Sequence, residues 1–176
     1  MQKLKSIKLY FFSILKLAFL SFRNYYLKSD FYNKKLITEV PERIFYSPST
    51  YLTASLTAVS NDFYKITQTS PNLLWEISIN DKQNFENLHS FLWLTKLDRK
   101  FSKNITKTII KSWINNFYNY DQNVWEMQVT AKRIISWVSN IDITLENSDK
   151  TYKKKFFTSI VKQSNFLKKN LKNLFY

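Results

Sequence analysis

The spacing of apolar and polar positions divides the chain into three parts. Residues 1–28 combine a basic start with the apolar stretch LYFFSILKLAFLSF. Residues 29–79 lose the helical period, contain all three prolines and include the short runs RIFY and DFYKIT, which favour extended backbone. From residue 80 onward, apolar side chains recur at intervals of three and four. The pattern predicts a basic amphipathic N-terminal helix over 1–28, an irregular, partly β arm over 29–79, and a helical-hairpin domain over 80–176.

The helical domain is expected to contain four helical segments, at 83–97, 99–118, 124–140 and 149–174. The links YNYDQN and DITLENSD are short and polar, so neighbouring helices should run antiparallel as αα-hairpins. The last segment continues to the end of the chain without a glycine cap or a stop signal. A chain cut short and a frayed natural C-terminus both account for that feature.

The segment at 124–140 has an unusual distribution of side chains. Asn123 followed by Glu126 is an N-terminal capping signature, so this helix should start at about Val124. A helical wheel predicts that the core-facing stripe is formed by Met127, Ala131, Ile134, Ile135 and Val138. Roughly opposite, where a surface helix should be polar, lie Trp125, Lys132, Arg133, Ser136 and Trp137.

Two interpretations of that opposite face remain open. It can be a second packing layer, in which aromatic rings bury area and Arg133 points its charge outward. It can instead be a binding wall, because indole faces stack on sugar rings or bases and cations pair with carboxylate or phosphate. Arg133 lies four residues before Trp137, close enough to stack on its indole. The same choice applies to His89, as a structural histidine or as a residue that faces a groove.

The charge favours a polyanionic partner. The formal net charge is +14, with 27 lysines and arginines against 13 acidic residues. Such an excess suits nucleic acid, anionic lipid or acidic polysaccharide. An A/T-rich coding sequence would also produce many lysines and no glycine, so basicity alone does not identify the ligand. Nucleic acid is disfavoured because the lysines are scattered and no binding motif is present.

Missing residue types exclude several classes of site. The chain has no cysteine, no glycine and a single histidine, His89. Disulfides, cysteine-ligated zinc, a P-loop and the dinucleotide fingerprint are therefore excluded, and no metal or cofactor is predicted. The N-terminal apolar stretch is shorter than the ~20 residues of a membrane-spanning helix. Because no small-x-small cleavage site follows it, it is also a poor signal peptide.

The helical half resembles the N-terminal region of the heparinase II/III family of polysaccharide lyases. The order and separation of four elements agree together: LHSFLWLTKL at 88–97, SWINNF at 112–117, W-E-x-x-V-T-A-K-R-I-I-S-W at 125–137 and FFTSIVKQSNFLKKNL at 156–171. The resemblance is carried mainly by Trp93, Trp113 and the spacing from Trp125 to Trp137. The segments PERIFYSP and SPNLLWEI are similar more weakly.

This resemblance implies a mainly α fold whose hairpins form part of an (α/α) toroid around a substrate groove, normally followed by a β-sandwich domain. It implies β-elimination of an acidic, uronate-containing polysaccharide such as a glycosaminoglycan, and a periplasmic or other extracytoplasmic location. The candidate substrate-binding residues are Trp125, Arg133, Trp137, Lys132, Trp93 and His89. The family's catalytic asparagine, tyrosine and histidines lie beyond the matched region. We therefore predict no catalytic residue in this chain, which would represent an N-terminal portion of such a lyase or a small relative.

An alternative function comes from the N-terminal segment. A basic helical protein can dock on an anionic membrane through residues 3–28, whose apolar and basic side chains suit a membrane surface. Under that interpretation the lysines serve lipid headgroups, and the tryptophans of the helical half are packing residues.

Overall fold

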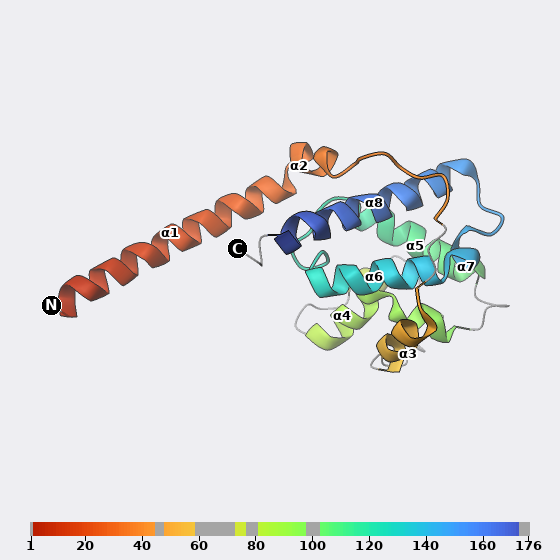
Figure 1. The fold of residues 1–176 in the computed structure, drawn as a ribbon, viewed down its shortest axis with the longest axis horizontal. Coiled ribbons are helices and arrows are strands. Elements are labelled where there is room, and N and C mark those ends of the chain that lie inside the picture. Colours follow the sequence, from red (N-terminus) through yellow and green to blue (C-terminus); the bar gives the residue numbers. More distant parts are fainter. Residues whose placement is uncertain (1, 45–47, 59–72, 77–80, 98–102, 173–176) are drawn as a thin grey trace.

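The backbone forms ten helical segments in the part of the chain that the computed structural model describes, residues 2–44, 48–58, 73–76, 81–97 and 103–172 (Figure 1). In chain order these are α1 (Gln2–Lys28), α2 (Asp30–Lys35), α3 (Thr50–Ala58), η2 (Leu73–Glu76), α4 (Lys82–Ser90), η3 (Leu92–Lys96), α5 (Lys103–Phe117), α6 (Met127–Ser139), α7 (Ile141–Leu145) and α8 (Lys150–Lys172). The fold is therefore mainly helical, as the sequence pattern predicts.

The predicted β character of the arm at 29–79 does not occur in its described residues, none of which lies in a strand. The arm instead begins with α2, where the Ser29 hydroxyl accepts a hydrogen bond from the Tyr32 N–H at 3.2 Å. This N-cap starts helix α2, which ends before the first of the arm's three prolines. The end of RIFY and the whole of DFYKIT lie outside the described residues.

The helical body is built around α6, which packs against α4 and α8, while α8 also packs against α5. Figure 1 shows that α6 and α8 run in opposite directions, the arrangement that a short connection between them predicts. Buried aromatic rings fill the space between these helices. Trp137 of α6 lies 5.2 Å from Trp113 of α5, 5.3 Å from Phe156 of α8 and 5.4 Å from Phe91, measured between ring centroids. These rings form the centre of the core.

Several predicted helix boundaries are wrong by a few residues. The segment predicted at 83–97 breaks at Phe91, whose φ of 59° is left-handed, and continues as the 3-10 helix η3. The helix expected to start at Val124 starts at Met127, where the Glu126 carboxylate accepts a hydrogen bond from the Val129 N–H at 2.9 Å. The link DITLENSD contains the short helix α7.

Helix α1 extends away from the body, and the rest of the structure contacts it near its C-terminal end (Figure 1). There the Arg23 guanidinium donates to Asn170 Oδ1 at 2.9 Å, and the Asn24 amide donates to Gln122 Oε1 at 2.9 Å. In the described part of the chain, no helix has both the length and the apolar character that crossing a membrane requires.

Candidate functional site

Five of the six residues predicted to bind substrate lie inside the core. Their exposed fractions are 2% or less for Trp93, His89, Trp125, Arg133 and Trp137, and the sixth, Lys132, is half-buried. The structure brings Arg133 and His89 together, but it leaves these five side chains no face on which a sugar ring can stack. The packing interpretation therefore describes this face of α6, and the binding-wall interpretation does not.

Arg133 is a fully buried cation whose hydrogen bonds all go to neutral acceptors. Its Nε donates to Gln163 Oε1 at 2.7 Å. Its Nη1 donates to the carbonyls of His89 at 2.8 Å and Val124 at 3.2 Å, and its Nη2 donates to the Thr130 hydroxyl at 3.1 Å. Burial holds the pKa of Arg133 well below its usual range, because desolvation penalises the charged form. Four hydrogen bonds offset part of that penalty and connect α6 to α4 and α8.

The aromatic partner of Arg133 differs from the predicted one. Its guanidinium lies 4.2 Å from the centroid of the Trp113 ring on α5, rather than on Trp137 of its own helix. The i to i+4 spacing made Trp137 available, but Trp137 packs against Trp113 and Phe156 instead. Contacts across helices therefore decide where the guanidinium stacks, which the spacing within one helix does not reveal.

His89 is a structural histidine. Its Nδ1 accepts a hydrogen bond from Trp113 Nε1 at 3.1 Å, so the neutral ring carries its proton on Nε2. Burial, with a smaller contribution from the nearby charge of Arg133, lowers the pKa of His89 from 6.5 to about 3. The imidazole is neutral at physiological pH and is buried among aromatic rings, of which that of Phe85 lies 4.3 Å away between centroids.

The helical wheel assigned only part of the core face of α6 correctly. Of its predicted stripe Val138 is buried, but Met127, Ala131, Ile134 and Ile135 are only half-buried, although Met127 and Ile134 pack against the core. The other buried residues of this helix are Val129, Thr130, Arg133, Ser136 and Trp137. The Ser136 hydroxyl donates to the Phe91 carbonyl, which accounts for its burial. One signal of the true face was present in the sequence: Val129, Thr130, Arg133, Ser136 and Trp137 follow one another at helical spacing. Their polarity hid it.

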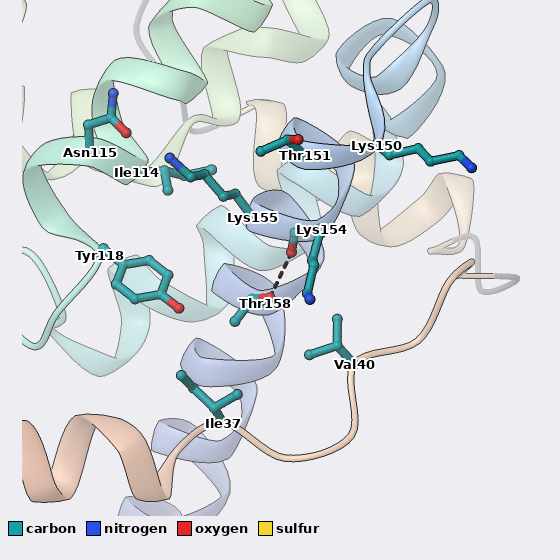
Figure 2. A pocket seen from close by; sticks show the side chains of 10 residues that line it. All are labelled: Ile37, Val40, Ile114, Asn115, Tyr118, Lys150, Thr151, Lys154, Lys155 and Thr158. Carbon is teal, nitrogen blue, oxygen red and sulfur yellow. Dashed lines mark hydrogen bonds between the residues drawn. The ribbon is translucent and has the colours of Figure 1, made fainter.

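A pocket of about 810 Å³ opens on another side of the body, between α5, the first turns of α8 and the segment after α2 (Figure 2). Its apolar lining comes from Ile37, Val40 and Ile114. Most of its surface is apolar, and its remaining lining residues carry polar or charged groups: Asn115, Tyr118, Lys150, Thr151, Lys154, Lys155 and Thr158. These ten residues include three lysines and no carboxylate.

The arm forms one wall of this pocket because α8 holds it in place. The Asn165 amide donates to the Leu36 carbonyl at 2.9 Å and to the Thr38 hydroxyl at 3.0 Å. Leu36 is fully buried, which fixes the chain just before Ile37 and Val40. The pocket thus joins residues more than a hundred positions apart in the sequence.

The three lysines of the pocket lie on successive turns at the start of α8. Lys150 and Lys154 are four residues apart and therefore lie on the same side of the helix. Figure 2 shows Lys155 reaching across toward Ile114 and Asn115, Lys154 pointing toward Val40, and Lys150 extending away from the others. All three are exposed. In the sequence, Lys154 and Lys155 belong to the basic run YKKKFF, a pattern typical of a solvated helix face. They border a pocket because Ile37 and Val40 of the arm form its opposite wall.

Tyr118 is held at the edge of the pocket by a second buried cation. The Lys162 ammonium lies 3.8 Å from the Tyr118 ring centroid and donates to the Tyr118 carbonyl at 2.8 Å and to Asn119 Oδ1 at 2.9 Å. Burial lowers the pKa of Lys162 to about 8 and raises that of the Tyr118 phenol. Tyr118 therefore keeps its proton at neutral pH and faces the pocket as a hydrogen-bonding group.

This pocket is suited to an anionic ligand that also carries hydroxyl groups. Lysine ammonium groups pair with carboxylates or sulfates, and the hydroxyl and amide side chains can exchange hydrogen bonds with a sugar. Among the described residues, no group of three or more histidine, aspartate or glutamate side chains gathers where it could hold a metal ion. Comparisons of the chain with protein-family models, with curated proteins and with solved structures find no match.

Proposed function

We propose that this chain binds an acidic polysaccharide in the pocket between α5, α8 and the arm. The observation that carries the proposal is the lining itself, in which Lys150, Lys154 and Lys155 accompany hydroxyl, amide and apolar side chains without a carboxylate. Uronate or sulfate groups pair with the lysines. Sugar hydroxyls bond to Asn115 and Thr151, and the apolar faces of the rings lie against the aliphatic side chains.

The resemblance to heparinase II/III lyases motivates the choice of ligand over other polyanions. In this proposal the helical hairpins are part of an (α/α) toroid, and the chain holds the polymer while catalytic groups outside the matched region perform the elimination. The bound segment of polymer lies along the pocket bordered by Lys150, Lys154 and Lys155, here called the lysine pocket, rather than over Trp125, Arg133 and Trp137. Tyr118 does not serve as the base, because burial raises its pKa.

The test is a binding titration of the whole chain with heparan sulfate, hyaluronan and alginate. The variant Lys154→Glu/Lys155→Glu reverses two charges of the pocket. A matched control, Lys34→Glu/Lys168→Glu, makes the same change in net charge at two exposed lysines that do not line the pocket. At low salt we expect the pocket variant to bind about tenfold or more weakly and the control to lose much less, since each exposed charge contact contributes up to about 1 kcal/mol.

Two further readouts separate the parts of the proposal. The difference between pocket variant and control should shrink as salt rises from about 0.05 to about 0.3 M, because screening weakens exposed ion pairs. Ultraviolet absorbance of unsaturated uronate should stay flat, because the chain is proposed to bind without cleaving. Equal losses in the two variants, or no binding by the unaltered chain at low salt, would refute the pocket as the site.

A further inference from the structure

Helix α1 carries many large apolar side chains that remain exposed in the described structure. The most exposed are Tyr25 at 78% and Tyr10 and Phe22 at 71% each. Among the side chains that the structure describes on this helix, from residue 6 onward, the exposed large apolar ones are Ile7, Leu9, Tyr10, Phe11, Phe12, Ile14, Leu15, Leu17, Phe19, Leu20, Phe22, Tyr25 and Tyr26. A continuous apolar surface of this kind marks an interaction site.

The exposed surface of α1 has two sides. At about 100° per residue, a narrow polar stripe contains Ser6, Ser13, Lys16, Arg23 and Asn24. Most of the large apolar side chains form a broad arc on the other side, with Phe11 and Phe22 close to its centre. Leu9 and Leu20 lie within the polar stripe, and Lys8 lies within the arc at the same wheel angle as Tyr26.

The body contacts α1 on the side of the polar stripe. Arg23 and Asn24 make the hydrogen bonds to Asn170 and Gln122, and Leu27, which lies between them on the wheel, is only 7% exposed. The body therefore fixes the rotation of the helix about its own axis, and the centre of the apolar arc, at Phe11 and Phe22, faces away from it. An apolar ligand would meet the centre of the arc without displacing a contact of the body, whereas Tyr26, to one side of that centre, packs edge-on against Tyr32 of α2 at 5.2 Å between ring centroids.

The charges of α1 select among the surfaces that can cover this arc. The segment 2–28 contains five lysines and Arg23 but no aspartate or glutamate. Pairing with the same helix of a second copy would bring cations together without a carboxylate to offset them. Anionic lipid headgroups supply the complementary charge, and the basic side chains can reach them while their aliphatic stems lie on apolar surface.

The length of the apolar stretch decides how α1 meets the lipid. Leu9 to Phe22 is about 21 Å long in a helix, shorter than the ~30 Å hydrocarbon core, and Lys16 interrupts it. A spanning orientation would therefore place charge inside the bilayer. An orientation in the plane of the interface buries the arc and leaves the stripe in the headgroup region.

We propose that α1 docks on an anionic membrane surface, lying in its plane with the arc around Phe11 and Phe22 inserted and the stripe of Lys16 and Arg23 toward water. The proposal is independent of the polysaccharide pocket, since no residue of α1 lines that pocket. It assigns the helix the task of placing the body beside a lipid surface.

The first experiment measures sedimentation of the full chain with vesicles. Vesicles of phosphatidylcholine with about one third phosphatidylglycerol should bind the chain at least about tenfold more strongly than phosphatidylcholine alone. The variant Phe11→Asn/Phe22→Asn should lose at least about tenfold in affinity for the anionic vesicles. The matched control Phe31→Asn/Tyr51→Asn removes two aromatic side chains that are 68% and 84% exposed outside α1, and it should bind like the unaltered chain.

The second experiment reads out the orientation. Because the chain has no cysteine, Phe11→Cys and Ser13→Cys each provide a single labelling position for an environment-sensitive fluorophore. On anionic vesicles, the label at position 11 should gain intensity and shift to the blue, and the label at position 13 should change little.

Three results would overturn the proposal. The first is equal binding to neutral and anionic vesicles, and the second is equal responses from the two labels. The third is self-association of the lipid-free chain that Phe11→Asn/Phe22→Asn abolishes, because a second copy would then cover the arc. Binding to polysaccharide is measured without lipid, so failure of either proposal leaves the other standing.

Discussion

Acidification should break the hydrogen bond between Trp113 and His89 and thereby destabilise the fold. In the native state Nδ1 of His89 accepts from Trp113 Nε1, an arrangement that only an unprotonated Nδ1 permits. Adding a proton would orphan the indole N–H inside the core and place a second cation near Arg133. The folded protein therefore resists protonation of this ring, whereas the unfolded chain accepts it near pH 6.5.

The size of the effect follows from linkage. The pKa of His89 is about 3 in the folded state against 6.5 for an ordinary histidine, so the unfolded state binds more protons between these values. The contribution is fully present above pH 6.5 and is lost as the pH falls toward 3. Between pH 7 and pH 5 the loss should be about 2 kcal/mol, close to the limiting slope of ~1.4 kcal/mol per pH unit below pH 6.

The assay is urea unfolding at pH 7, 6 and 5, followed by tryptophan fluorescence, for the unaltered chain and for His89→Gln. Glutamine keeps an acceptor for Trp113 and does not titrate, so the difference between the two unfolding free energies isolates the imidazole. We expect the advantage of the unaltered chain over the variant to shrink by about 2 kcal/mol from pH 7 to pH 5. Because His89 is the single histidine, its NMR signal should also show no titration between pH 5 and 8.

Parallel pH dependences for the unaltered chain and the variant would refute this reasoning. So would an imidazole signal that titrates near pH 6.5 while the protein remains folded, because that result would mean that the ring is hydrated and that the Trp113 hydrogen bond is weak.

Substitutions at three further residues, Arg133, Glu126 and Lys162, test other polar contacts by urea unfolding at pH 7. Arg133→Ala should lower the unfolding free energy by about 3–5 kcal/mol, whereas Arg133→Met, which fills the space and removes a desolvated charge, should lower it by less than half as much; equal losses would contradict this account. Glu126→Ala should cost about 1 kcal/mol through loss of the α6 cap, with Glu126→Asp retaining most of it, and a loss as large in the aspartate variant would argue against capping. Lys162→Met should cost about 1.5–3 kcal/mol by removing two charge-assisted hydrogen bonds. Since the folded pKa of Lys162 is about 8 against 10.5, the unaltered chain should also gain stability relative to this variant as pH rises from 8 to 10.5, and a flat difference would show that the ammonium is hydrated.

Much of the helical body could be predicted from the sequence. The apolar period of three and four places α5 and α8 near their observed positions, because each helix buries one stripe of apolar side chains. The short link before α8 correctly predicted a reversal of direction. The arm departs furthest from its prediction, since helices α2, α3 and η2 occur in it, and the Ser29 cap is the local signal for the start of α2.

The candidate site could not be predicted in the same way. Arg133 is buried because its acceptors are supplied by Gln163 on α8, by the backbone of His89 on α4 and by Val124 just before α6. A helical wheel considers one helix and treats an arginine as a surface residue. The lysine pocket depends equally on distant partners, because Asn165 of α8 fixes the arm that forms its wall.

The sequence by itself therefore determined the helical class, the basic character of the chain and the apolar arc of α1, all of which follow from composition and local periodicity. The tertiary structure decided which face of α6 became the core, where the helix breaks at Phe91, and which lysines border a pocket. The physical reason is the same in each case: a buried polar group is tolerated only when another part of the chain supplies its hydrogen-bond partner, and that partner is identified only once the helices are packed together.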